Sequence, residues 1–233
     1  MKAILELIAY FFRWLANEPS VAQKTDAAQD ISIPDTTTQV VSTAVATKGA
    51  ARPYMTNAMV RFLGQLRALE SGKGGYNSDY ANDDRWPLTT ATFDQVLAWS
   101  KAQVATGGRV GKREASSAIG GYQFMSYTLG SLKSSLKLSG KEIFDSTFQD
   151  DLAVALMIRR GYMRFMRGEI SATAFCINLA KEWASLPVVT PMQGAHRWLK
   201  AGQSYYAGDG LNKALIDSET FYNLVQDIKK EGM

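Results

Sequence analysis

The fold of this chain turns on one stretch, Ala68-Leu69-Glu70-Ser71-Gly72-Lys73-Gly74-Gly75-Tyr76, in which an apolar helical pattern ends in a glycine-rich turn. Upstream of it, five apolar residues recur at the spacing of one helix face: Met59, Phe62, Leu63, Leu66 and Leu69. This pattern predicts a helix from about residue 56 to residue 69 with one buried face. Glu70 then lies at the last turn of the helix and is expected to face the space beside the glycine-rich loop.

Glu70 stands where a general acid would be favoured. A carboxylate at a helix C-terminus lies at the negative end of the macrodipole, which disfavours the ionised form and raises the pKa, and apolar surroundings act in the same direction. A general acid needs such a raised pKa at neutral pH. Position alone is weak evidence, because most glutamates at helix ends are solvated surface groups without a task.

The composition is that of an ordinary soluble globular protein, with 46% hydrophobic and 21% charged residues in 233. A single cysteine, Cys176, and a single histidine, His196, argue against an internal disulfide, a cysteine nucleophile and a dedicated zinc site. We therefore expect no metal and no cofactor. The formal charge of +4 favours polyanionic partners, which include nucleic acid, anionic lipid and the bacterial cell wall. Nucleic acid ranks last, since no basic stripe is interleaved with aromatic residues.

The chain is expected to have three parts. Residues 1–17 form an apolar helical pattern with a narrow polar stripe that includes Glu6 and Arg13, too short and too charged to span a bilayer. We interpret it first as an amphipathic helix that lies on a membrane surface or docks on a partner protein, and second as a signal anchor. Residues 18–53 lack periodicity and predict a flexible linker, which leaves 54–233 as the folded domain.

The rest of the domain is predicted to be mainly helical. The capping-box pattern Thr92-Phe93-Asp94-Gln95 opens a second helix that runs to about residue 104, and Ser139 with Glu142 and Ser146 with Gln149 repeat the same spacing. Further helices are expected up to residue 138 after the Ser116–Met125 segment, and over 148–160, 170–183, 193–200 and 219–230. Three tryptophans at helical spacing are assigned to the core: Trp99, Trp183 and Trp198. His196 is interpreted as a partly buried structural residue.

Four segments carry a resemblance to a known family. They are Glu70 with Gly75-Tyr76, Gly120-x-Tyr122-Gln123, Phe148-Gln149-Asp150 with Leu152-Ala153 before Arg160-Gly161, and Trp183-Ala184-Ser185-Leu186-Pro187. In this order they resemble the phage endolysins typified by the bacteriophage lambda lysozyme, a lysozyme-like lytic transglycosylase. The likeness extends over about residues 54–200.

The resemblance implies an α+β, mainly helical, two-lobed lysozyme-like domain with a short β-containing region and a cleft between its lobes. The substrate would be peptidoglycan, cut at the β-1,4 bond between N-acetylmuramic acid and N-acetylglucosamine. Glu70 matches the catalytic acid, and Tyr76, Ser117, Tyr122 and Gln123 fall in the segments expected to bind substrate. Such an enzyme would act on the wall in the periplasm, tethered to a membrane or carried in a phage particle.

The chain departs from the family pattern at three places. Gly121 stands where members often have arginine, so the contact of that arginine must be absent or replaced. Asn77 stands where the lambda-type sequence has an acid after Gly-Tyr. The segment 92–112 has the character of an insertion relative to the shortest members.

Two mechanisms remain open. Hydrolysis usually needs a second carboxylate, and the candidates are Asp79, Asp83, Asp84 and Glu114. Asp79 has the spacing from Glu70 found in phage lysozymes that use a Glu-Asp-Thr set. Arg85 replaces their threonine, which weakens this interpretation. Asp79 and Asp84 are kept as possible second acids. A transglycosylase needs only one group, which protonates the leaving oxygen and then accepts the proton of the C6 hydroxyl. The rival to both is a non-catalytic wall-binding protein of the phage particle.

Aromatic and amide side chains near these segments suggest sugar contacts. Tyr76, Trp86 and Tyr122 offer ring faces that suit the C–H surface of a pyranose, although ordinary packing explains Tyr76 and Trp86 equally well. Gln123 has an amide that suits an N-acetyl group, with a helix-capping contact as the alternative.

Overall fold

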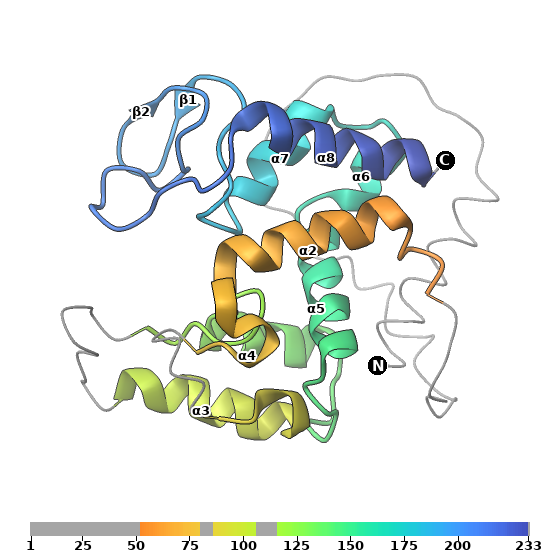
Figure 1. Cartoon of the computed structure of the whole chain (residues 1–233), viewed down its shortest axis with the longest axis vertical. Helices are drawn as coiled ribbons and strands as arrows, with labels where there is room; N and C mark the ends of the chain where they lie inside the picture. Colours follow the sequence, from red (N-terminus) through yellow and green to blue (C-terminus); the bar gives the residue numbers. More distant parts are fainter. Residues whose placement is uncertain (1–51, 80–85, 106–115, 233) are drawn as a thin grey trace. The chain divides into compact units, whose positions relative to one another are not determined.

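The computed structural model describes residues 52–79, 86–105 and 116–232. The expected amphipathic helix, the linker up to residue 51, and the carboxylates Asp83, Asp84 and Glu114 lie outside this part of the chain. By its internal contacts the chain divides into two units, which among the described residues are 63–154 and, separately, 52–62 with 155–232. The elements are labelled in Figure 1.

Helix α2 (Asn57–Ser71) confirms the first predicted helix and ends two residues later than expected. The four apolar residues predicted at the start of its buried face, from Met59 to Leu66, are at most 2% exposed, and Leu69 is half-buried. A 3-10 helix, η2 (Gly72–Asn77), follows directly. Within it Gly75 has φ 54° and ψ −135°, a conformation that residues with a Cβ strongly disfavour, so the glycine is required where the chain turns away from α2.

The first unit contains η2, η3 (Leu88–Thr90), α3 (Phe93–Ala105), α4 (Ser126–Ser135) and the start of α5 (Ser146–Arg159). Its core is a cluster of aromatic rings that meet edge to face, with centroids 5.9 to 6.4 Å apart, and its members are Phe93, Phe124, Phe144 and Phe148. All four are at most 2% exposed. Burial of these rings joins α3 and α5 to the segment between them.

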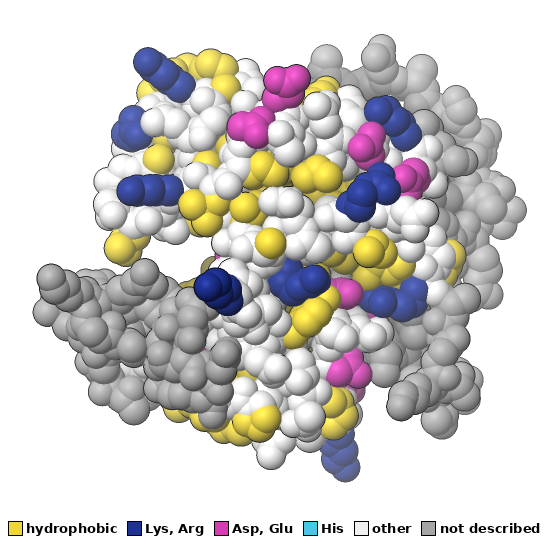
Figure 2. Space-filling model, in the orientation of Figure 1, with side chains coloured by type: hydrophobic (Ala, Val, Ile, Leu, Met, Phe, Trp, Pro, Cys, Tyr) yellow, Lys and Arg dark blue, Asp and Glu magenta, His cyan; other side chains and the backbone are white. Residues whose placement is uncertain are grey.

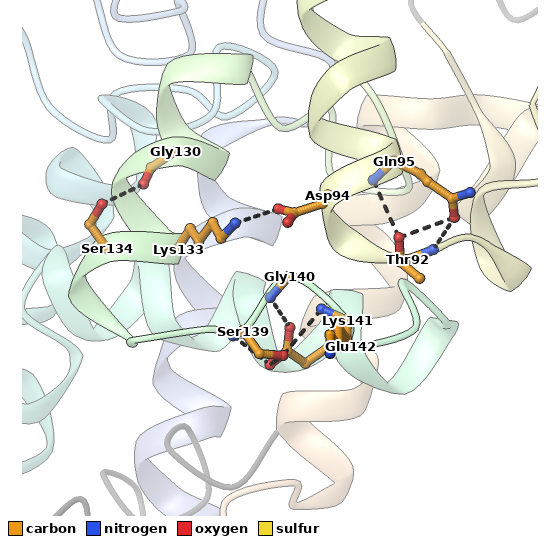
Figure 3. Close-up of polar contacts among 10 residues, drawn as sticks. All are labelled: Thr92, Asp94, Gln95, Gly130, Lys133, Ser134, Ser139, Gly140, Lys141 and Glu142. Atoms are coloured by element: carbon orange, nitrogen blue, oxygen red, sulfur yellow. Dashed lines mark hydrogen bonds and ion pairs between the residues drawn. The ribbon is translucent and has the colours of Figure 1, made fainter.

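The capping box at the start of α3 is confirmed (Figure 3). The Gln95 amide nitrogen of the backbone donates to Thr92 Oγ1 at 3.4 Å, and Thr92 N donates to Gln95 Oε1 at 2.9 Å. One residue into the helix, Asp94 forms an ion pair of 2.5 Å with Lys133 of α4. The N-terminus of α3 is thus satisfied locally and tied to the neighbouring helix.

The other two capping-box spacings form different structures. Glu142 does accept hydrogen bonds from the backbone of Ser139 and Gly140, at 2.9 and 2.8 Å, but it closes a loop and no helix begins there (Figure 3). At α5 the cap is Asp145, whose Oδ1 accepts from Phe148 N at 2.8 Å, and not Ser146. Gln149 is fully buried and turns inward instead of folding back on the helix start.

The second unit is built from the start of α2 and the rest of α5 with α6 (Tyr162–Met166), α7 (Ala172–Ala180) and α8 (Ser218–Glu231). Phe165 stacks on Phe175 with centroids 4.8 Å apart. Cys176 beside this pair in the sequence is fully buried, and burial raises the pKa of its thiol to about 12. Cys176 therefore serves as a small buried apolar residue.

The helix predicted over residues 193–200 is wrong. The segment forms an antiparallel hairpin of β1 (Met192–Gln193) and β2 (Trp198–Leu199), paired in the register Met192 with Leu199 and Gln193 with Trp198. A Cβ on Gly194 would lie 2.7 Å from the Tyr205 carbonyl oxygen, so the close packing of strand and loop requires glycine here. The predicted core position of Trp198 is also wrong, since it is 64% exposed, and His196 is exposed.

The fold class is confirmed as α+β and mainly helical, with one small two-stranded sheet among the described residues. Trp183 is buried as predicted, at 3% exposure. Within the described part of the chain, no helix combines the length and the apolar composition that crossing a bilayer requires.

Candidate active site

Glu70 lies in the last turn of α2, where the sequence predicted it, and its side chain is partly exposed. The chain then passes through η2 to Tyr76, which is half-buried. All residues of the site described below belong to the first unit.

Behind η2, four side chains form a hydrogen-bonded group that we call the tyrosine–carboxylate network: Arg67, Tyr76, Tyr122 and Asp150. Oδ1 of Asp150 accepts from both phenols, at 2.8 Å from Tyr76 and 2.6 Å from Tyr122. Arg67 Nη1 donates to the Tyr76 hydroxyl oxygen at 2.6 Å, and its guanidinium carbon lies 4.3 Å from the centre of the Tyr76 ring. The network therefore joins α2, η2, the 120–123 turn and α5.

Both phenols of the network stay protonated at physiological pH. Burial, with the hydrogen bond and negative charge of Asp150, raises the pKa of Tyr76 to about 12, and the nearby Arg67 charge opposes the shift. Burial and Asp150 raise the pKa of Tyr122 still further. Each hydroxyl consequently acts as a fixed donor to the carboxylate.

Tyr122 is only 1% exposed and its hydroxyl is committed to Asp150. It therefore supports the site from within, and a direct stack on a sugar ring is incompatible with this arrangement. Ser117 is 3% exposed, and its Oγ accepts from Ser126 N at 3.1 Å at the start of α4. The structure thus gives both residues contacts inside the protein, whereas Tyr76 and Gln123 are partly accessible.

The Gly120–Gln123 segment is a tight turn between two paired residues. Ile119 and Phe124 exchange backbone hydrogen bonds of 3.1 and 2.9 Å, and Gly120 N donates to Ser78 O at 2.7 Å. Asp79 also pairs with Ile119 through the backbone. These short pairings are the β-type part of the first unit, and they hold the turn against the end of η2.

Gln149 connects the same parts from inside the core. Its Oε1 accepts from Gly121 N at 2.8 Å, and its Nε2 donates to Tyr76 O at 3.0 Å and to Phe144 O at 2.9 Å. A fully buried amide with all these partners fixes the relative placement of turn, η2 and α5. The sequence pointed to Gln149 and Asp150 only as part of a motif, and Arg67 carried no signal beyond its place one helical turn before Glu70.

The departure at Gly121 is explained by Arg67. A Cβ on residue 121 would lie 3.0 Å from Arg67 Cδ and 3.1 Å from Tyr76 Cδ1. Arg67 therefore packs over the backbone of Gly121, and its guanidinium brings an arginine to this place from α2.

Asn77 has a structural task. Its Oδ1 accepts from Thr89 N at 3.0 Å and from Thr89 Oγ1 at 3.1 Å, which ties η2 to η3. A carboxylate could accept the same two hydrogen bonds. The amide at this position therefore preserves the contact without a charge.

Gln123 adopts a left-handed backbone conformation with φ 49°, which is uncommon for a residue with a side chain. Its Nε2 donates to Gly120 O at 2.9 Å, and no described residue donates to its Oε1. This leaves an amide oxygen able to accept a hydrogen bond at the surface of the turn. Gln123 does not begin α4, which starts three residues later.

Asp79, the described candidate for a second acid, is 1% exposed. Trp86 stacks on Trp99 with centroids 5.6 Å apart and planes at 6°, and both rings are partly exposed, so Trp99 is not a fully buried core residue. In the described ranges no group of three or more His, Cys, Asp or Glu is placed to hold a metal ion.

The comparisons with known proteins identify the class. A family model described as Endolysin matches residues 62–211, well over half of the chain, and this span contains the whole tyrosine–carboxylate network and Glu70. The chain belongs to the endolysin family, and so to the phage enzymes that degrade peptidoglycan. No curated protein and no solved structure matches it.

Proposed function

We propose that the protein cleaves the β-1,4 bond between N-acetylmuramic acid and N-acetylglucosamine as a lytic transglycosylase, with Glu70 as its single acid and base. The observation that carries the proposal is the difference between Glu70, which is partly exposed at the end of α2, and Asp79, which is 1% exposed. A second acid must reach the sugar or its attacking water, and Asp79 is too deeply buried for this.

The reaction begins with a proton transfer from Glu70 to the leaving glycosidic oxygen, while the bond from that oxygen to C1 of muramic acid breaks. The C6 hydroxyl oxygen of the same muramic acid then bonds to C1, and its proton passes to the Glu70 carboxylate. The product carries a 1,6-anhydro ring, Glu70 regains its proton and no water is consumed. The same side chain therefore acts first as acid and then as base.

The tyrosine–carboxylate network supports this role by fixing the chain on both sides of Glu70. Arg67 precedes Glu70 by one helical turn, and Tyr76 follows at the end of η2, with the two joined at 2.6 Å. Catalytic groups must be held closely in place, so a clamp across η2 limits the movement of the acid between them. Tyr122 and Asp150 are positioning residues in this scheme.

Substrate binding is assigned to the accessible residues of the same unit. The Oε1 of Gln123 suits the N–H of an N-acetyl group, because its Nε2 already donates to Gly120 O. The ring of Tyr76 is half-buried and offers a face to a pyranose. Ser117 holds the start of α4 and contributes by placing the turn.

The test is digestion of purified sacculi with analysis of the products by mass spectrometry. Wild type is expected to release anhydromuropeptides, which are lighter by one water than hydrolysed products, and Glu70→Gln to release none. Asp84→Asn tests the remaining possible second acid and should leave the products unchanged.

Three outcomes would contradict the proposal. Reducing-end products alone would indicate a hydrolytic muramidase, and loss of activity in Asp84→Asn would identify its second acid. Equal release by wild type and Glu70→Gln would remove Glu70 from the chemistry. No release by either would favour a non-catalytic wall-binding protein.

A further inference from the structure

The β1–β2 hairpin of the second unit is firmly held against its neighbouring loop. Leu199 of β2 is fully buried, and Gly194 N donates to Arg197 O at 2.9 Å across the turn. Ala195 N donates to Tyr205 O at 3.0 Å, which fixes the turn against the loop. The backbone of the hairpin is therefore preorganised.

On this fixed backbone one large ring points outward. Trp198 is 64% exposed, although the next residue, Leu199, is fully buried, as expected from the alternation of side chains along a strand. A ring held on an ordered backbone loses little conformational freedom when it meets a partner. Its flat apolar face suits the C–H face of a sugar ring.

The same hairpin and its neighbouring loop carry a net positive charge. Residues 186–216 contain the cations Arg197, Lys200 and Lys213, all exposed, and one carboxylate, Asp209. Neither Arg197 nor Lys200 forms an ion pair with a carboxylate of the described residues. Figure 2 shows Lys and Arg side chains gathered over the β1 and β2 region, with Asp and Glu side chains placed elsewhere on that face.

The single carboxylate of this segment, Asp209, forms no ion pair with Arg197 or Lys200. The backbone N–H groups of Leu211 and Asn212, each 2.9 Å from Asp209 Oδ1, hold the pKa of Asp209 down at about 2. Asp209 therefore stays ionised, and its one negative charge offsets only part of the three positive charges, which leaves residues 186–216 net positive.

We propose that Arg197, Trp198 and Lys200 of the second unit form an anchoring surface for peptidoglycan, in addition to the proposed catalytic residues of the first unit. The indole would lie on a sugar ring, and the two flanking cations would meet carboxylates of the peptide stems. This inference rests on the proposed substrate and extends it to a second contact. A membrane surface fits less well, because interfacial binding needs several apolar side chains on one face and β2 exposes a single one between cations.

The binding test uses the full-length chain with Glu70→Gln, so that the polymer stays intact, and measures co-sedimentation with purified insoluble sacculi. Adding Trp198→Ala should weaken the apparent affinity about fivefold. Adding Arg197→Glu with Lys200→Glu should weaken it about tenfold and reduce its dependence on salt. Thermal unfolding should be unchanged, because all three side chains are exposed.

Matched controls separate this surface from general effects. Leu215→Ala removes another exposed apolar side chain, 59% exposed, and Lys141→Glu reverses another exposed cation. Leu215→Ala should bind sacculi as the parent does, and Lys141→Glu should weaken binding less than half as much as the double reversal at the hairpin, because it changes the net charge but not this surface. In the Glu70-intact chain, Trp198→Ala should slow digestion of sacculi and leave the rate on a short soluble glycan unchanged.

The inference is overturned if the hairpin variants bind sacculi as tightly as the parent, or if the control variants weaken binding as much. It is also overturned if Trp198 is needed for binding to vesicles of phosphatidylglycerol and phosphatidylcholine but not to sacculi. If wild type releases no products while binding still depends on Trp198, the proposed function fails and the anchoring surface stands.

Discussion

At the scale of single residues, the carboxylate of Asp150 depends on two phenolic donors, and one of them is almost fully buried. Replacing Tyr122 by Phe keeps the ring and removes one donor, so the free energy of unfolding should fall by about 1.5 kcal/mol. Turnover on sacculi should fall while KM changes little, because the Tyr122 hydroxyl is bonded to Asp150 and Tyr122 is proposed to position the site. Urea denaturation and initial rates measure the two effects.

The control for this change is Tyr127→Phe, at a tyrosine that is 73% exposed. It should alter the free energy of unfolding by less than about 0.5 kcal/mol. A larger KM in Tyr122→Phe with unchanged turnover would contradict a positioning role and restore a direct contact with the sugar.

The buried thiol of Cys176 gives a pH dependence to the stability of the protein. Burial raises its pKa from 9.0 to about 12, so the unfolded chain loses this proton first as the pH rises. The stabilisation is complete below about pH 9 and is lost between 9 and 12, at about 1.4 kcal/mol per pH unit. Above pH 9 the free energy of unfolding of Cys176→Ala should fall less steeply than that of wild type, in urea curves recorded with a reductant. Parallel slopes would contradict this assignment.

At the scale of elements, Gly121 lies where side chains of α2 and η2 pack against the 120–123 turn. A methyl group there would meet Arg67 Cδ at 3.0 Å and Tyr76 Cδ1 at 3.1 Å, so Gly121→Ala should lower the free energy of unfolding by about 1 to 2 kcal/mol. Combined with Arg67→Ala, the loss should be smaller than the sum of the two single losses, because the clash is removed. Thermal and urea unfolding of the four proteins measure this coupling.

Gly130 in α4 is the matched glycine, since a Cβ there would meet nothing within 4 Å. Gly130→Ala should raise the free energy of unfolding by about 0.5 to 1 kcal/mol through the better helix propensity of alanine. If Gly121→Ala raises the free energy of unfolding as Gly130→Ala does, the short distances at Gly121 do not make a side chain there destabilising.

The helices were predictable where their own residues determine them. The apolar spacing of α2 and the capping box of Thr92 and Gln95 each depend on residues close together in the sequence, and both predictions were confirmed. The 192–199 hairpin was missed because it depends on the packing of Gly194 against Tyr205, outside the window that periodicity examines. The capping-box spacing of Ser139 and Glu142 gave the predicted side-chain contacts without a helix, so these contacts can also close a loop.

The candidate site was predictable in its parts and not in its connections. Glu70, Tyr76 and Tyr122 were all selected from sequence, but the network depends on Asp150, which lies 74 residues beyond Tyr76 in the chain. The sequence also assigned Tyr122 to the sugar, because burial cannot be inferred from a motif. Contacts over such separations come from tertiary packing, which a local pattern does not contain.

At the scale of the whole molecule, the net charge of +4 and the sequence pI near 9.1 favour attraction to an anionic polymer such as the cell wall. Salt should therefore slow the digestion of sacculi several-fold between about 0.05 and 0.5 M, because the screening length shortens to a few ångströms. Sacculi whose stem carboxylates have been amidated should be digested with little dependence on salt. The slope for native sacculi should also flatten as the pH approaches 9, where the net charge vanishes. Equal salt dependence on both polymers would show instead that salt acts on the folded enzyme, and the charge-reversed hairpin variant would then behave as wild type.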